Sequence, residues 1–459
     1  MKTYEAIVVG GGQAGLPLAN NLADKGWSVA VIEREHLGGS CINYGCTPTK
    51  TMISSSRVAQ TVREAGEFGI LTGPPRVDME AVLSRKDKIV LDWRQNLLNK
   101  IESRPNITLY RGEAHFSGDH TVEVNGEELT SPKIFINTGT RSRVPDIEGI
   151  EHIPYLTNKT IIELATLPKH LLVIGGSYVG LEFGQMFLRF GSQVSVIEYS
   201  EQIISHEDED VSAALQQALA AEGMRFYLNC EAQQVADPVD GKLVLSVRQR
   251  DSGKVEEIIG SHLLIGAGRT PNTEALDLAR AGIQTNEHGY IRTNEYLETN
   301  VPGIFALGDV KGGPAFTHIS YNDYQILYHN LFHEDKKSIQ NRLVPYALYT
   351  EPELGRVGMS EKAARASGRP LKIGKIPMDW VARAIESGQT EGLMKVIIDA
   401  ETDHILGAAV LGPQGGELVQ TLMALMLAHA PWTVFYQAMF IHPTLSEGFF
   451  ALMNSVEPA

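Results

Sequence analysis

The fold is decided by Ala6-Ile7-Val8-Val9-Gly10-Gly11-Gly12-Gln13-Ala14-Gly15, a short apolar run that leads directly into a glycine-rich turn. An amphipathic segment follows as far as Gly26, and a second apolar run, Val29 to Ile32, ends at Glu33. Strand, GxGxxG turn, helix and strand in this order form a βαβ unit of the kind that binds a dinucleotide.

Each glycine of this turn has a physical role. Gly10 permits the tight turn, Gly12 lets the backbone approach a pyrophosphate, and Gly15 brings the helix close to the strand. The pyrophosphate would lie at the helix N-terminus, where free N–H groups and the helix dipole favour anions. Glu33 would accept hydrogen bonds from a ribose diol.

The same layout returns later in the chain. Leu171 to Ile174 is followed by Gly175-Gly176-Ser177-Tyr178-Val179-Gly180, and Val194 to Ile197 ends at Glu198. In both copies the acidic residue lies 18 positions after the last glycine, and both copies end in Val-Ile-Glu. Ser177 departs from the pattern, because it stands where the middle glycine usually lies. The duplication predicts two dinucleotide sites.

Composition and charge exclude several classes of protein. A chain of 459 residues with 43% hydrophobic and 21% charged residues is globular and long enough for about three domains. A net charge of −15 argues against a nucleic-acid partner. We expect no membrane span, because no apolar run approaches the roughly 18 residues required. With only three cysteines and no signal-peptide pattern at the N-terminus, we expect a cytoplasmic protein.

Turn-rich segments indicate the domain boundaries. An apolar run from Ile134 to Ile136 leads to a turn at Thr138-Gly139, and Leu263 to Ile265 leads to an exit loop around Gly268. After Val344 the pattern changes to alternating strands and long helices, such as Glu417 to His429. We therefore predict an α/β fold of two Rossmann-like dinucleotide-binding domains and an α+β C-terminal domain, divided into residues 1–145, 146–265, 266–340 and 341–459.

The most informative stretch for chemistry is Cys41-Ile42-Asn43-Tyr44-Gly45-Cys46-Thr47-Pro48-Thr49-Lys50. We expect a loop that leads into a helix, with Thr47 as N-cap and Pro48 at the first helical position. The helix dipole favours the thiolate of a cysteine just ahead of the helix. If the loop turns back, the two sulfurs come within disulfide distance, although a static disulfide or two buried thiols remain alternatives. We expect no metal site, because no second cysteine pair or histidine cluster supplies further ligands, and Cys230 is expected to fill the core.

Five motifs in a fixed order make the chain resemble the pyridine nucleotide–disulfide oxidoreductases. This flavoenzyme family includes dihydrolipoamide dehydrogenase, glutathione reductase and mercuric reductase. The resemblance covers nearly the whole chain and is specific for the family, but much less so for the substrate. The motifs are Gly10 to Gly15, Cys41 to Cys46, Gly175 to Gly180, Thr299 to Asp309, and His442 to Glu447.

The resemblance implies that the first unit binds FAD. Residues 1–145 and 266–340 would form the FAD-binding domain, with Glu33 on the adenosine ribose and Asp309 on the ribitol. The helix start at Thr317 would face the pyrimidine edge of the flavin. We also assign Thr138, Gly139 and Gly268 to cofactor binding.

The second unit, residues 146–265, would bind the nicotinamide cofactor. The resemblance places the turn of Gly175, Ser177 and Gly180 at its pyrophosphate and makes Tyr178 a lid over the nicotinamide pocket. Glu198 suits a free ribose 2′-hydroxyl and would repel a 2′-phosphate, and no Lys or Arg lies between Glu198 and Arg225. We expect NAD(H) rather than NADP(H).

The cysteines would carry the electrons. By resemblance, Cys46 faces the flavin, Cys41 exchanges with the substrate, and Lys50 and Glu182 form an ion pair beside the flavin. A hydride would pass from NADH to FAD, the flavin would reduce the Cys41–Cys46 disulfide, and the dithiol would reduce a small or protein-bound disulfide. The reverse path would oxidise a dithiol, as in dihydrolipoamide dehydrogenase.

His442 and Glu447 resemble the family's catalytic base and the carboxylate that orients it. In the family this pair acts at the disulfide of the partner subunit. The resemblance therefore implies a homodimer that is built through the dimerisation domain, residues 341–459.

The sequence is also compatible with other functions. The stretches from Cys46 to Lys50 and from Arg383 to Glu386 resemble the mercuric reductase branch. That branch uses an additional cysteine pair near the C-terminus, whereas nothing after Cys230 is a cysteine, so efficient mercuric ion reduction is not expected. The alternatives are a mercuric reductase-like enzyme without the C-terminal cysteine pair that reduces a metal ion or another acceptor such as a quinone, the flavoprotein subunit of a multienzyme complex, and a redox-inert flavin-binding scaffold.

Overall fold

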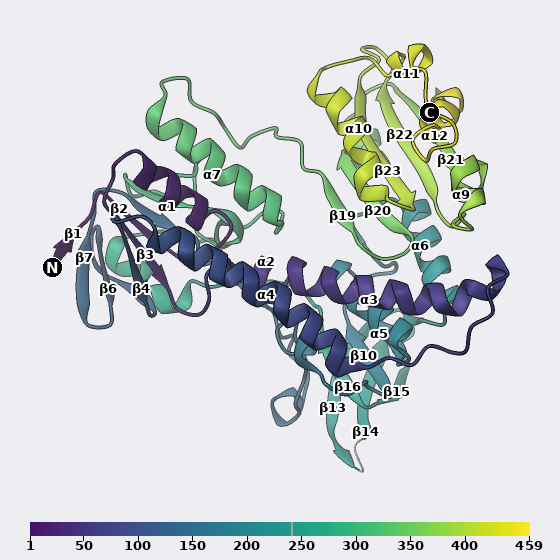
Figure 1. Cartoon of the computed structure of the whole chain (residues 1–459), viewed down its shortest axis with the longest axis horizontal. Coiled ribbons are helices and arrows are strands. Elements are labelled where there is room, and N and C mark those ends of the chain that lie inside the picture. The colour runs from purple at the N-terminus through teal and green to yellow at the C-terminus, as the bar shows by residue number, and fades with distance from the viewer. Residues whose placement is uncertain (240–241) are drawn as a thin grey trace.

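Two parallel sheets carry the two glycine-rich turns. The computed structural model describes residues 1–239 and 242–459 (Figure 1). Neighbouring strands are parallel throughout the first sheet, which has the order β18-β8-β2-β3-β4, and throughout the second, which has the order β12-β11-β10-β16. The first sheet comprises β2 (Ala6–Val9), β3 (Val29–Glu33), β4 (Ile107–Arg111), β8 (Ile134–Ile136) and β18 (Ile304–Ala306). The second comprises β10 (His170–Ile174), β11 (Gln193–Ile197), β12 (Arg225–Tyr227) and β16 (His262–Ile265).

Helices α1 (Gly15–Asp24) and α5 (Tyr178–Phe190) follow the two turns, as the duplication predicts. In α1, Leu16, Ala19 and Leu22 fall three residues apart and are all buried, because this spacing places them on one face of a helix. Strand β18 follows the second unit in the sequence but pairs with β8 of the first sheet. The first sheet is therefore built from two distant parts of the chain.

The cysteine segment differs from the predicted loop. Cys41 lies in a short helix, α2 (Gly39–Tyr44), and α3 (Cys46–Glu64) begins at Cys46 itself. Thr47 is therefore not an N-cap, and Pro48 occupies the third helical position, where its missing N–H costs no helical hydrogen bond. The break falls at Gly45, where a Cβ would lie only 2.9 Å from the carbonyl oxygen of Ser40.

The C-terminal region forms an antiparallel sheet of order β19-β20-β23-β22-β21-β24, with α10 packed on it (Figure 1). Its elements are β19 (Tyr346–Leu348), β20 (Glu353–Gly358), α8 (Glu361–Ala366), β21 (Leu371–Pro377), α9 (Ala382–Glu386), β22 (Leu393–Asp399), β23 (Ile405–Gly412), α10 (Gly415–Leu427), α11 (Val434–Gln437), α12 (Gly448–Asn454) and β24 (Glu457–Pro458). The predicted helix Glu417 to His429 begins two residues earlier and ends at Leu427, because His429 takes the left-handed conformation (φ 51°) that follows many helix ends.

Long helices and small sheets complete the fold. Helix α3 packs against both α4 and α5. Cys230 is buried in the core beside the second parallel sheet, as expected. Among the described residues, no helix is both long and apolar enough to span a bilayer.

The remaining elements are α4 (Met79–Glu102), α6 (Glu209–Ala221), α7 (Thr317–Phe332), β1 (Lys2–Thr3), β5 (Ala114–Gly118), β6 (Thr121–Val124), β7 (Glu127–Thr130), β9 (Thr140–Ser142), β13 (Cys230–Val239), β14 (Lys242–Gln249), β15 (Val255–Gly260) and β17 (Arg269–Pro271).

Candidate active site

The first glycine turn is held in a conformation that excludes side chains. Gly10 has φ +105°, and a Cβ there would lie 2.3 Å from the carbonyl oxygen of Asn137. One carboxylate oxygen of Glu33 accepts a hydrogen bond from the N–H of Gly11 at 2.8 Å, and the other accepts from Glu35 at 2.7 Å. The Glu33 carboxylate thus holds the end of β3 against the turn that follows β2.

The second turn repeats this geometry. Gly175 has φ +106°, and the carboxylate of Glu198 accepts hydrogen bonds from the N–H groups of Gly176 at 2.6 Å and Ser200 at 2.7 Å. Ser177 immediately precedes α5 with extended backbone (φ −106°), so a side chain is tolerated at this position. The sequence duplication is therefore also a structural duplication.

One cavity of about 1140 Å³ connects the first glycine turn with the cysteine pair. Many of the site residues that were predicted from the sequence line this cavity. The predicted residues that line it are Gly10, Gly12, Glu33, Cys41, Cys46, Lys50, Thr138, Gly139, Tyr178, Glu182, Asp309 and Thr317. Those outside its lining are Gly15, Gly175, Ser177, Gly180, Glu198, Gly268, His442 and Glu447.

The two cysteines lie together as free thiols. A hydrogen bond from Cys41 lowers the pKa of the Cys46 thiol to about 6; burial opposes this shift, and the positive charge of Lys50 assists it. The same hydrogen bond, together with burial, raises the pKa of Cys41. The hydroxyl of Thr317 lies 3.4 Å from the sulfur of Cys46. Cys46 is therefore the thiolate of the pair, and Cys41 keeps its proton.

An ion pair lies beside the cysteines. The ammonium group of Lys50 is 2.6 Å from one carboxylate oxygen of Glu182, and the other oxygen accepts a hydrogen bond from the N–H of Tyr349 at 3.0 Å. Burial on its own would lower the pKa of Lys50, but Glu182 and Cys46 raise it above its ordinary value. Lys50 is therefore a fixed positive charge next to the Cys46 thiolate.

Polar groups of the cavity wall suit the FAD that the resemblance implies. Asp309 accepts a hydrogen bond from the hydroxyl of Thr140 at 3.0 Å. The buried hydroxyl of Thr138 has no hydrogen-bond partner among the described residues, which is unusual unless a ligand satisfies it. At Gly12, a Cβ would lie 2.8 Å from Asn137 Oδ1, so a side chain is disfavoured there and the turn presents bare backbone. The residues present fit a dinucleotide.

Sequence reasoning missed several residues of this cavity. Asn137 joins the turn to the rest of the sheet, because it accepts from the N–H of Gly15 at 2.9 Å and donates to the carbonyl oxygen of Leu307 at 2.9 Å. Phe316 and Tyr349 also line the wall. Asn137 directly follows a buried strand, which was a usable signal, whereas the two aromatic residues lie in segments without a recognisable motif.

His442 and Glu447 pair with each other but lie outside the cavity. The carboxylate of Glu447 is 2.9 Å from Nδ1 of His442 and can only accept, so Nδ1 donates and Nε2 remains available to solvent. The His442 side chain is 72% exposed. Within this single chain, the structure does not bring the pair to the cysteines.

Comparisons with known proteins agree along the whole chain. A model described as pyridine nucleotide-disulphide oxidoreductase matches residues 4–323, and that family's dimerisation domain matches residues 344–452. The probable pyridine nucleotide-disulfide oxidoreductase RclA of Escherichia coli (strain K12) is 34% identical over 465 residues, covering 100% of both chains. A dihydrolipoyl dehydrogenase of Thermus scotoductus is 36% identical over 460 residues, covering 100% of this chain and 97% of the relative. A mercuric reductase of Staphylococcus aureus is 32% identical over 416 residues, covering 91% and 76%.

Solved structures give the same result. The HOCl-induced flavoprotein disulfide reductase RclA from Escherichia coli superposes with a TM-score of 0.89 at 33% identity, covering 98% of this chain and 99% of that chain. The structure of its Cu(II) complex superposes with a TM-score of 0.90 and covers 99% of both chains.

Proposed function

Because the chain belongs to the pyridine nucleotide-disulphide oxidoreductases and is a FAD-dependent enzyme of that family, we propose that Cys41 and Cys46 reduce a small or protein-bound disulfide. NADH would supply the two electrons. The overall reaction converts NADH, a proton and a disulfide into NAD⁺ and two thiols. The observation that carries the proposal is the placement of Cys41 and Cys46 as free thiols in one cavity, together with Lys50 and the first glycine turn.

The chemistry of the chain's own residues follows from thiol–disulfide exchange. The sulfur of Cys41 attacks the substrate disulfide, which forms a mixed disulfide and releases one thiol. The Cys46 thiolate then attacks the Cys41 sulfur, which releases the second thiol and leaves a Cys41–Cys46 disulfide. Lys50 stabilises the negative charge on Cys46, and a base must accept the proton of Cys41. FAD, when bound, supplies the two-electron link between the nicotinamide and this disulfide.

We assign the FAD to the cavity beside the first glycine turn. Gly10 and Gly12 would receive the pyrophosphate, Glu33 the adenosine ribose, and Asp309 the ribitol. Residues 1–145 and 266–340 would form this domain. The hydroxyl of Thr138, which lacks a partner among the described residues, would gain one from the cofactor.

Anaerobic titration of the FAD-loaded protein with NADH tests this proposal. A long-wavelength absorption band should appear after two electrons per flavin, because the Cys46 thiolate would then lie against oxidised FAD. The number of accessible thiols should rise by two in the same step. Bleaching of the flavin absorbance without the band or the thiols would exclude the cysteine pair from the electron path.

The acid at the second turn favours NADH over NADPH. Glu198 directly follows β11, whereas Glu33 is the last residue of β3. The Glu198 carboxylate would accept a hydrogen bond from a free 2′-hydroxyl and repel a 2′-phosphate. A nearby cation, Arg250, lies over the ring of Tyr199 at 3.8 Å and donates to the carbonyl oxygen of Tyr199 at 3.1 Å. Arg250 is therefore already engaged by neighbouring groups.

Glu198→Ala should lower kcat/KM for NADH by roughly tenfold to a hundredfold, because a charge-assisted hydrogen bond contributes about 1.5–3 kcal/mol. The value for NADPH should fall less or rise, since repulsion of its phosphate is removed. Parallel steady-state assays with both cofactors measure this ratio. An equal loss for both would mean that Glu198 only supports the turn through its bonds to Gly176 and Ser200.

We further propose a cytoplasmic homodimer in which His442 serves the cysteine pair of the partner. The dimerisation domain supports self-association. Around His442 the surface is apolar and open, with Met439 98% exposed and Ile441 78% exposed, which is typical of an interface. A second subunit would cover this surface and bring the base that Cys41 requires.

A metal ion is a second candidate acceptor, favoured by the Cu(II) complex of the RclA relative. Among residues 1–239 and 242–459, no group of three or more His, Cys, Asp or Glu could hold a metal ion. Two thiols suit Cu(I), so Cys41 and Cys46 would receive the ion. Two Cu(II) ions would take two electrons from one NADH, and rapid NADH oxidation with Cu(II) as the sole acceptor would favour this candidate.

A further inference from the structure

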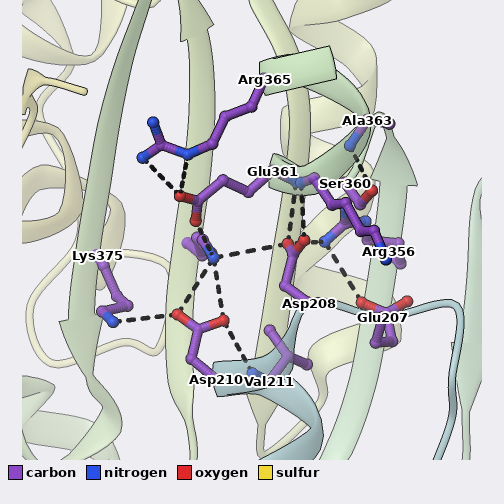
Figure 2. A network of polar contacts seen from close by, with 12 residues as sticks. Glu207, Asp208, Asp210, Val211, Arg356, Ser360, Glu361, Ala363, Arg365 and Lys375 are labelled. Carbon is purple, nitrogen blue, oxygen red and sulfur yellow. Dashed lines mark hydrogen bonds and ion pairs between the residues drawn. The ribbon is translucent and has the colours of Figure 1, made fainter.

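A buried charged cluster joins the second parallel-sheet unit to the C-terminal sheet (Figure 2). Asp208 and Asp210 lie at the start of α6, and Arg356 and Lys395 come from β20 and β22. Arg356 Nη1 is 3.3 Å from Asp208 Oδ2, and Lys395 Nζ is 3.0 Å from Asp210 Oδ1. The side chains of Arg356 and Lys395 are each only 2% exposed. The two units are thus fixed relative to each other by groups that are largely withdrawn from water.

Glu207 links this cluster to a tyrosine. One of its carboxylate oxygens accepts a hydrogen bond from the hydroxyl of Tyr346, the first residue of β19. The other lies 3.4 Å from Arg356 Nη1 and has no hydrogen-bond partner among the described residues. Burial raises the pKa of Glu207 to about 7, although the positive charge of Arg356 opposes the shift.

Tyr346 connects in turn with the active-site cavity. Its ring stacks on Phe316, with the centroids 5.5 Å apart and 6° between the ring planes. Phe316 directly precedes α7 and packs against Tyr178, 5.6 Å away. His318 stacks on the same phenylalanine and donates a hydrogen bond to the carbonyl oxygen of Pro345 at 2.7 Å. Phe316 and Tyr178 both line the active-site cavity, so a continuous set of contacts connects the charged cluster with the wall of that cavity.

We propose that Tyr346 is a positioning residue, which Glu207 orients and which fixes Phe316, so that Phe316 and Tyr178 form a preformed wall for the nicotinamide cofactor. This inference rests on the proposed function, in which Tyr178 lies at the nicotinamide pocket. A wall that is already ordered binds a planar ring at a lower entropic cost.

The contact between Glu207 and Tyr346 makes this wall sensitive to pH. A carboxylate accepts a stronger hydrogen bond than a carboxylic acid does, so the hydroxyl of Tyr346 is held most firmly when Glu207 is ionised. Lowering the pH through neutrality protonates Glu207 and loosens the contact. The titratable or charged groups that face Glu207 or its cluster are Tyr346 from β19, Arg356 from β20, Glu361 and Arg365 from α8, Lys375 from β21, Lys395 from β22, and Asp208 and Asp210 from its own segment.

Calorimetric titration of the FAD-loaded protein with NAD⁺ at pH 6, 7 and 8 tests the inference. In the wild type, the Kd should rise about threefold or more from pH 8 to pH 6, as the ordering of the wall is lost. Tyr346→Phe keeps the ring but removes the hydroxyl, and Glu207→Gln removes the charge. Each should have the higher Kd already at pH 8, with no further change on acidification. The double variant should bind no more weakly than either single variant, because both remove the same interaction.

Arg365→Gln is the matched control. Arg365 is 52% exposed and pairs with Glu361 at the rim of the cluster, without contact to Tyr346. Its Kd and pH dependence should equal those of the wild type. A shift as large as that of Tyr346→Phe would show general loosening between the units and would overturn the inference.

The remaining outcomes separate the inference from the proposed function. Equal NAD⁺ binding by the wild type, Tyr346→Phe and Glu207→Gln at every pH would overturn the inference alone. A wild-type protein that does not bind NAD⁺ would contradict the proposed function, and the inference with it. If Glu207→Gln does not fold, Tyr346→Phe carries the test, since it preserves both the stacking ring and the buried charges.

Discussion

Replacing Cys46 by serine is expected to reduce NADH-dependent disulfide reduction by about a thousandfold or more in kcat, since residues that act as one catalytic unit lose nearly all activity together. Serine oxygen cannot close a disulfide with Cys41, so the mixed disulfide formed on Cys41 would not be resolved. The loss of NADH absorbance with lipoamide as acceptor measures the effect. FAD content should remain that of the wild type, because in the proposed arrangement Cys46 would lie beside the flavin without being needed to retain it.

Cys230→Ser provides the control for this experiment. Cys230 is buried and donates to Gln249 Oε1 at 2.9 Å, a bond that serine can also make, so turnover should be unchanged. Wild-type turnover of lipoamide by Cys46→Ser would refute the proposed electron path. If Cys46→Ser lost lipoamide reduction but still oxidised NADH with a quinone, that acceptor would take electrons without the cysteine pair.

The fold could be predicted where its causes are local in sequence. Glycine spacing and apolar periodicity located both parallel-sheet units, and strands such as Val29–Glu33 and His170–Ile174 were predicted to within one residue. The cysteine segment was predicted less well. Its break at Gly45 arises from close contact with the carbonyl oxygen of Ser40, and a packing contact of this kind leaves no periodic signal.

The site was predictable only where a motif marked it. The resemblance predicted the pairing of Lys50 with Glu182, which the structure places 2.6 Å apart although 132 residues separate them. No motif marked Phe316 or Tyr346. Their importance arises from stacking between segments that belong to different units, and such contacts depend on how the whole chain packs. The role of His442 depends on a second subunit and stays a prediction.

His442→Ala is expected to lower disulfide reduction by roughly a hundredfold to ten-thousandfold, the range of a lost general base. The reason lies in Cys41: its hydrogen bond to Cys46 and its burial raise its pKa, so it cannot lose its proton readily without help. Glu447→Gln should cause a smaller loss, because it only weakens the orientation of the imidazole. Steady-state assays with lipoamide measure both variants, and NADH oxidation by artificial electron acceptors should be unaffected.

Mixed dimers decide whether this base acts across the subunit interface. A heterodimer of one Cys46→Ser chain and one His442→Ala chain, isolated through two different affinity tags, combines subunits that are each severely impaired as homodimers. If His442 serves the partner, the intact cysteine pair of the His442→Ala chain receives the histidine of the Cys46→Ser chain, and one of the two sites regains wild-type turnover. If His442 serves its own chain, neither site is complete and the heterodimer stays inactive. Recovery of activity would therefore establish a catalytic dimer and explain why His442 lies exposed, outside the cavity of its own chain.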